Sequence, residues 1–258
     1  MVWSTLSGNK SLLLLVALFV AIPLFVGCGG NKSLQIPSPE QRFQEIKKLF
    51  DRKKYDRVIE EVEVYLIAFS GTAKVDSAQL LLAEAHFKQG EFILAQSEYE
   101  RLAEQFPASP LVEEARYKSA ISWWELSPKR QLEQSNTIKA LEEFQQMLEE
   151  YPSSTFAKDC EDHINRCREK LALKELDAAQ LYLKMRKYDS AIIYFDRILE
   201  TYYLTTAEPW ALVGKGDALA KLTEKAAAEA AYKQCLNKFP GTEAAITAGK
   251  AIRELEKK

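Results

Sequence analysis

Glycine and proline are scarce in this chain, with 10 and 9 copies among 258 residues, and charge of one sign does not dominate. Because these two residues break helices, their scarcity favours a helical protein. The formal net charge is -2, and basic residues alternate with acidic ones along the chain. This balance argues against a nucleic acid or an anionic membrane surface as the partner.

Cysteine and histidine are also rare, with four and two copies. Beyond Cys28, the cysteines are Cys160, Cys167 and Cys235. Cys160 and Cys167 lie on one predicted helix with their Cα atoms ~10.5 Å apart, beyond the ~7 Å that a disulfide allows. An odd count also argues against a disulfide framework, so we expect buried, free thiols.

Motifs that carry catalysis are missing as well. The chain has no HExxH, no GxSxG and no phosphate-binding glycine-rich loop, and Gly-Lys-Gly at residues 214–216 suits close helix packing instead. We expect His86 to be a packing residue and His163 to lie on a solvated, charged helix face. Cys160, His163 and Cys167 share a helix face but supply at most three ligands. We therefore predict no enzyme, no metal site and no cofactor.

The N-terminal 27 residues differ from the rest, since they lack Asp and Glu and contain the apolar run 12–26. About 15 apolar residues suit a signal peptide better than a membrane span, which needs ~20. The run ends in Phe25-Val26-Gly27-Cys28, which resembles the lipobox of bacterial lipoproteins. The resemblance implies that Cys28 is lipidated and anchors the protein to a membrane. Alternatives are an ordinary signal peptide with an incidental cysteine and a retained transmembrane helix.

The chain is expected to have four parts. Residues 1–27 form the signal peptide, and residues 28–39, rich in glycine, proline and polar residues, form a lipidated tether. Residues 40–152 hold three N-terminal repeats. Residues 153–258 hold a long bridging helix and two further repeats.

A helical frame recurs along the folded part. A small residue is followed by an aromatic residue four positions later and by proline eight positions after that, as in Ala95, Tyr99 and Pro107. This is the second-helix signature of tetratricopeptide repeats, in which small residues let helices approach and proline ends the helix. The sequence predicts an all-α solenoid of five repeats. The other copies are Val58 and Val62; Ala140, Phe144 and Pro152; Ala191, Phe195 and Tyr203; and Ala228, Tyr232 and Pro240, with Ala83, Ala120, Ala179 and Gly216 at the small first-helix position.

Two intervals between repeats are enlarged. We expect a loop inserted at Ser127–Asn136 in the third repeat. Between Pro152 and Tyr188 the chain has no glycine or proline. This stretch predicts one long helix that joins the third and fourth repeats, with Ser153 or Ser154 as its N-cap.

Signal peptide, lipobox, five repeats and a bridging helix, in this order, resemble the BamD family of lipoproteins. The stretches AQLLLAEAHFKQGEFILAQSEYERLAEQFPASP and EEARYKSAISWWEL are similar to its second and third repeats. The resemblance implies an outer-membrane lipoprotein, on the periplasmic side, of the machinery that inserts β-barrels. Its partners would be the C-terminal segments of barrel precursors at the N-terminal repeats. The barrel-forming core subunit and other assembly lipoproteins would bind at the C-terminal repeats.

In a solenoid of this kind, three first-helix positions in each repeat line the concave groove. Several of them are aromatic here, where a solvated face would favour Lys or Glu. Either these side chains bind a precursor segment, or they pack between repeats or against the N-terminal segment. The predicted groove residues are Phe43, Lys47, Phe50, Leu80, Glu84, Phe87, Tyr117, Ile121 and Trp124.

Two other functions fit the same features. One is a different periplasmic repeat lipoprotein that coordinates cell division and envelope constriction or assembles a pilus secretin. The other is an enzyme that uses the repeats for targeting, which we disfavour because no residues are left over for a catalytic domain.

Overall fold

The computed structural model describes residues 37–257 and contains eleven helices and no strand within that range. Signal peptide, Cys28 and most of the predicted tether lie outside it. Residues Pro39–Lys258 form one compact unit. The division that we expect at residue 152 therefore stays a proposal, and the first helix begins at Pro39, one residue before the predicted start.

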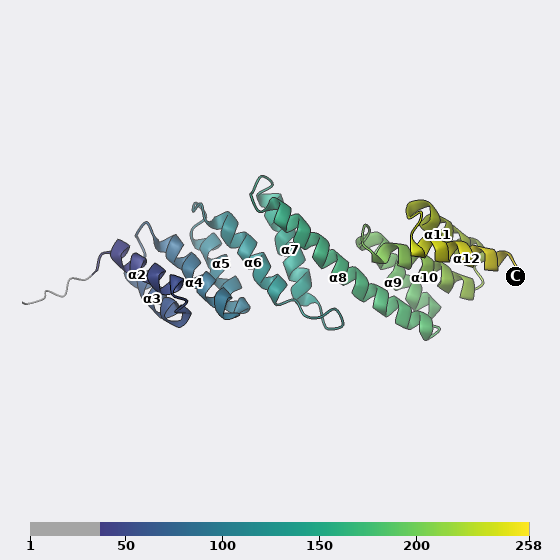
Figure 1. The fold of residues 1–258 in the computed structure, drawn as a ribbon, viewed down its shortest axis with the longest axis horizontal. Coiled ribbons are helices and arrows are strands. Elements are labelled where there is room, and N and C mark those ends of the chain that lie inside the picture. The colour runs from purple at the N-terminus through teal and green to yellow at the C-terminus, as the bar shows by residue number, and fades with distance from the viewer. Residues whose placement is uncertain (1–36, 258) are drawn as a thin grey trace, which may run out of the picture. The chain divides into compact units, whose positions relative to one another are not determined.

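The helices pair in chain order into five helix–turn–helix repeats, and each packs against the next (Figure 1). The pairs are α2 (Pro39–Asp51) with α3 (Tyr55–Ala68), α4 (Val75–Gln89) with α5 (Phe92–Gln105), α6 (Val112–Glu125) with α7 (Ser135–Glu150), α8 (Ala157–Lys184) with α9 (Tyr188–Thr201), and α10 (Ala207–Lys221) with α11 (Lys225–Lys238). A further helix that we did not predict separately, α12 (Glu243–Glu256), packs on α10 and α11. The predicted all-α, five-repeat array is confirmed.

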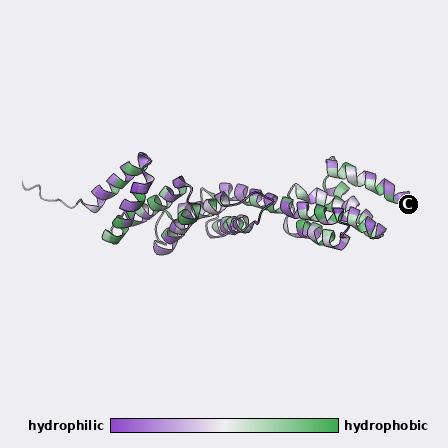
Figure 2. Cartoon of the chain, turned by 90° about the horizontal axis from the view of Figure 1, so that it is seen from below, coloured by the Kyte–Doolittle hydropathy of each residue, from purple (hydrophilic) through white to green (hydrophobic). Residues whose placement is uncertain are grey.

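The core follows the predicted small and aromatic frame. The small second-helix positions are fully buried, and the rings four positions later, such as Tyr99 and Phe195, are equally inaccessible. Most helices carry both hydrophobic and hydrophilic residues (Figure 2), because each buries one side against its neighbours. Stacking neighbouring repeats therefore builds the core that one repeat cannot form alone.

Four repeats close their internal turn in the same way. At the end of each first helix, one residue has a left-handed backbone, and the following N–H donates to a carbonyl five residues earlier, as from Glu91 to His86 at 3.0 Å. This is the Schellman end of a helix, which favours glycine. Only the second repeat has glycine there, Gly90, while the others use Lys53, Arg186 and Thr223.

Helix α8 has 28 residues and packs against α7 at one end and α9 and α10 at the other. The predicted bridging helix is therefore confirmed. The predicted serine N-cap is wrong, because Ser154 closes a turn with Tyr151 and Phe156 occupies the cap. The Phe156 ring stacks on the Tyr117 ring at a centroid distance of 4.6 Å, and α8 begins at the next residue, Ala157.

The inserted segment of the third repeat lies along α8. Lys170 Nζ donates to Ser127 Oγ at 2.6 Å, and Arg130 pairs with Asp177 at 2.8 Å. The segment ends at α7, which begins at Ser135, so the last two residues of the predicted loop are helical. Within the described residues, no helix is both long and apolar enough to cross a membrane.

Candidate functional site

The predicted groove residues of the first repeat differ in how far they are buried. Phe43 is 6% exposed and packs against Tyr65 with a ring-centroid distance of 6.1 Å, so its place in the groove is a wrong prediction. Lys47 is exposed. Phe50 is half-buried and meets Tyr55, the first residue of the next helix, edge to face at 5.5 Å.

In the second repeat, the predicted groove residues are tied to neighbours. Phe87 meets Phe92 edge to face at 5.1 Å within its own repeat, as Phe50 meets Tyr55, and the choice between binding and packing stays open for both rings. Leu80 is half-buried and packs against the core around Ala95 and Tyr99. Glu84 accepts a hydrogen bond from the Tyr99 hydroxyl at 2.7 Å and forms an ion pair with Lys118 of the next repeat.

The Glu84 network couples the second and third repeats electrostatically. Burial opposes the charge of Lys118, but its bonds to Glu114 and Glu84 outweigh burial and raise the pKa of the ammonium. Burial, together with the nearby Glu84, raises the pKa of Tyr99 far above its usual range. The Glu84 side chain therefore serves as a link between repeats, and its predicted role in contacting a bound segment stays untested.

In the third repeat, Tyr117 and Ile121 are half-buried around the core, and Trp124 lines a cavity. The Trp124 ring lies edge to face with His163 at 5.9 Å, and His163 stacks on Phe144 at 4.8 Å. His163 is half-buried, so the expectation of a solvated face holds only in part: the ring packs in this cluster, while the neighbouring Glu161 and Asp162 are exposed. The charged residues next to His163 in the sequence indicated a solvated helix face. The aromatic cluster joins side chains of α6, α7 and α8, which no local pattern predicts.

The cysteines that share a face with His163 are fully buried and free, as predicted. Burial raises the pKa of the Cys160 thiol to about 11 and that of Cys167 to about 12. Such thiols are protonated at neutral pH, and buried cysteines of this kind are unreactive. Among residues 37–257, no cluster of His, Cys, Asp or Glu could hold a metal ion.

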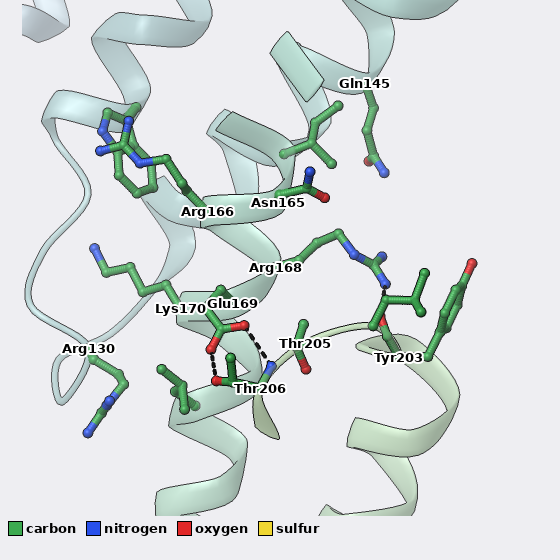
Figure 3. A pocket seen from close by; sticks show the side chains of 14 residues that line it. Arg130, Gln145, Asn165, Arg166, Arg168, Glu169, Lys170, Tyr203, Thr205 and Thr206 are labelled. Atoms are coloured by element: carbon green, nitrogen blue, oxygen red, sulfur yellow. Dashed lines mark hydrogen bonds between the residues drawn. The ribbon is translucent and has the colours of Figure 1, made fainter. Parts of the chain in front are cut away.

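The cavity that Trp124 lines has a volume of about 870 Å³ and lies between α8 and the turn from α9 to α10 (Figure 3). We call it the α8 cavity. Its walls combine cations with apolar and aromatic side chains, and Glu169 is the one acidic residue that lines it. The residues used below are Trp124, Arg166, Arg168, Lys170, Tyr203 and Leu204.

Each α8 cation has a fixed position. Arg166 lies 4.6 Å from the centre of the Trp124 ring, and Lys170 lies 5.4 Å from it on the same side of the cavity. Arg168 donates to the Tyr203 carbonyl at 3.1 Å and lies 5.1 Å from the centre of the Tyr203 ring. Figure 3 shows Arg168 on the Tyr203 side and Lys170 on the opposite side. The arrangement suits recognition of carboxylates near apolar groups.

Sequence reasoning missed all of these residues except Trp124. The basic residues at 166, 168 and 170 lie within a mixed-charge helix, which usually indicates a solvated surface. One signal was available, because Tyr203 stands where the repeat pattern expects proline. The role of Tyr203 depends on how α8 packs against its turn, since Arg168 and Tyr203 are 35 residues apart in the sequence.

Comparison with known proteins matches residues 37–252 to a family described as "YfiO: Outer membrane lipoprotein". The chain is similar to "Outer membrane protein assembly factor BamD" of Rickettsia prowazekii (strain Madrid E), with 27% identity over 194 residues, 74% of this chain and 77% of that protein. It is also 27% identical over 133 residues to the protein of that name from Caulobacter vibrioides, across 52% of this chain and 44% of that protein.

Among solved structures, the TPR2AB domain of yeast Sti1 in its pHSP90 complex is similar at a TM-score of 0.45 and 17% identity, and the match covers 84% of each chain.

Proposed function

Because the chain belongs to the YfiO family of outer membrane lipoproteins, we propose that it is a scaffold of the machinery that assembles proteins into the outer membrane. The observation that carries this proposal is the family match across residues 37–252, which includes all five repeats. Relatives that align over 74% and 80% of this chain are named outer membrane protein assembly factors. The role is one of binding, and no enzymatic step is proposed.

The N-terminal repeats are proposed to bind the C-terminal segment of unfolded β-barrel precursors. Lys47 supports this role, because its exposed ammonium could pair with a terminal carboxylate. Phe50 and Phe87 are half-buried and would offer the accessible edges of their rings. Phe43 is left out of this surface because it lies in the core.

The C-terminal repeats are proposed to dock on the barrel-forming core subunit and on smaller lipoproteins of the assembly. A division of labour between the halves is consistent with α8, which begins the fourth repeat and also packs against α7 of the third. Cys28 lies outside the described residues, and its lipidation on the periplasmic side of the outer membrane is part of the proposal. Two or more acyl chains would give a stable anchor.

Purification of the full chain from detergent-solubilised membranes tests the function. We expect a large β-barrel protein with periplasmic domains to co-purify. Recovery of division or pilus components in its place would favour the alternative repeat lipoproteins and contradict the proposal. Cys28→Ser should release the chain from the membrane fraction, and retention of this variant would contradict the lipid anchor.

The precursor surface is tested by charge reversal. Lys47→Glu should weaken binding of a barrel C-terminal peptide about ten-fold, as loss of one charged contact does. Lys48→Glu is the matched control, since it makes the same change on a neighbouring exposed position of α2. Fluorescence anisotropy measures both affinities. Equal affinities for the two variants would remove Lys47 from the surface.

A further inference from the structure

The turn between α9 and α10 departs from the other turns between repeats. In the fifth repeat, Pro240 and Gly241 follow the second helix, and Gly241 has a left-handed φ of 81°. The fourth repeat has Tyr203 and Leu204 at these positions, and Leu204 adopts the same backbone with φ 64°. Its side chain is 82% exposed. A left-handed backbone is strained for leucine, and the exposure of a large apolar side chain to water is also unfavourable.

The turn is held in place from both sides. Glu208, which is 2% exposed, accepts the Leu204 N–H at 2.7 Å and pairs with Lys238. On the other side, Glu169 of α8 accepts the Thr206 N–H at 3.0 Å and also the Thr206 hydroxyl (Figure 3). The surrounding contacts therefore fix the strained backbone and present Leu204 beside the α8 cavity.

The cavity beside this leucine has an excess of positive charge. Arg166, Arg168 and Lys170 bond to a ring nitrogen, a carbonyl and a hydroxyl, and no carboxylate lies within ion-pair distance of them in the part of the chain that the structure describes. Glu169 is occupied by the turn. Burial lowers the pKa of Lys170, which is consistent with a cation that lacks a compensating carboxylate.

We propose that the α8 cavity and the Tyr203–Leu204 turn bind an extended acidic segment of a partner protein that also carries an aromatic or aliphatic side chain. The carboxylates would pair with Arg166, Arg168 and Lys170, and the apolar side chain would pack against Trp124, Tyr203 and Leu204. Guanidinium groups bind carboxylates with two parallel hydrogen bonds and stack on rings, which matches the lining. This surface lies between the third and fourth repeats and is additional to the two proposed above.

Charge complementarity selects this occupant. The cations lie on opposite sides of the cavity, so one compact anion would reach only some of them, whereas a segment with several carboxylates would reach all. The exposed leucine beside them favours a ligand with an apolar side chain of its own.

The test uses the full chain in detergent and a fluorescent acidic peptide that contains phenylalanine and leucine. Two variants remove different parts of the site: Arg168→Gln with Lys170→Gln, and Tyr203→Pro with Leu204→Gly, which installs the turn sequence of the fifth repeat. Each should weaken binding about ten-fold or more, because each removes charged or apolar contacts. Lys233→Gln on α11, an exposed cation outside the cavity, is the control and should leave affinity unchanged.

Circular dichroism establishes that each variant is folded before binding is compared. Unchanged peptide affinity in both folded variants would overturn the proposal, and so would equal binding of a peptide whose acids are replaced by amides. Anionic phosphatidylglycerol vesicles form a separate arm. Vesicle binding that depends on the same residues, without peptide binding, would assign the cavity to a lipid and reject a protein segment. The peptide result does not depend on which proteins co-purify with the chain.

Discussion

Single residues decide where this repeat array departs from a regular one. Lys53, Arg186 and Thr223 take the left-handed backbone inside their repeats, at the place where the second repeat has Gly90. Leu204 takes it between repeats, beside the cavity. The first three end helices in a common way. Leu204 does not, since its conformation is enforced by Glu208 and exposes an apolar side chain.

The backbone strain at Leu204 gives a stability prediction. A left-handed backbone costs a residue other than glycine about 1–2 kcal/mol, and glycine costs about 0.5–1 kcal/mol in chain entropy. Leu204→Gly should therefore raise the free energy of unfolding by up to about 1 kcal/mol in urea denaturation. The reverse change, Gly241→Leu, should lower it by about 1 kcal/mol. A marked loss of stability in Leu204→Gly would show that the leucine side chain stabilises the fold.

The buried thiols predict a loss of stability in alkali. Burial raises the pKa of Cys160 to about 11 and that of Cys167 to about 12, from 9.0 for a free thiol. The folded chain thus holds these protons more tightly than the unfolded chain. This contribution is present below pH 9.0 and is lost as the pH rises through the folded-state values.

Thermal unfolding of the native chain and of a Cys160→Ala, Cys167→Ala variant at rising pH measures this contribution. The variant should lose less stability than the native chain between pH 9.0 and about 12. Parallel curves would show that tyrosines or lysines dominate the alkaline transition.

At the scale of helices, the close approach of α10 to α9 of the fourth repeat and to α11 of its own repeat depends on two glycines of α10. A Cβ on Gly214 would lie 2.2 Å from the Phe195 ring, and a Cβ on Gly216 would lie 2.4 Å from the Tyr232 ring. Both rings are buried aromatic positions of the repeat frame. The sequence interpretation of residues 214–216 as close helix packing is confirmed.

Adding a methyl group at these glycines should overpack the core. Gly214→Ala and Gly216→Ala should each lower the free energy of unfolding by about 1–3 kcal/mol. Gly249→Ala is the matched control on α12, where a Cβ would make ordinary contact with Leu236 at 3.7 Å. That control should be neutral or stabilising by up to about 1 kcal/mol, because alanine favours helix. Chemical denaturation measures all three, and equal effects would contradict the packing argument.

At the scale of the whole molecule, contacts run from each helix to its neighbours along the chain. Helix α12 ends the array by covering α10 and α11, with Ala244 and Ala248 buried against them. The stability of a repeat array is approximately the sum of local and nearest-neighbour terms. Damage at one end should therefore stay near that end.

Truncation before Glu243 tests this locality. Hydrogen exchange should accelerate in α10 and α11, because the apolar cluster that α12 covers becomes exposed. Protection in α2 and α3 should be unchanged, since neither contacts the removed helix. Uniform loss of protection along all five repeats would show that the array unfolds as a single cooperative unit.

The repeat architecture was predictable because its signal is local. Small residues, aromatic rings and helix-ending prolines recur at fixed spacing, and each repeat uses them in the same way. The same pattern predicted the bridging helix and the small residues at the helix contacts. It did not separate α12, nor did it show that the Phe43 ring packs on Tyr65.

The sequence by itself determined the helices, their pairing, the buried thiols and the resemblance to a lipoprotein family, because these depend on periodicity and short motifs. Only the tertiary structure decided which side chains meet across distant segments. The bond from Arg168 to Tyr203 and the bonds from Thr206 to Glu169 join residues 35 and 37 positions apart. Leu204 is exposed and left-handed because Glu208 and α8 hold its turn, and no spacing rule encodes that contact.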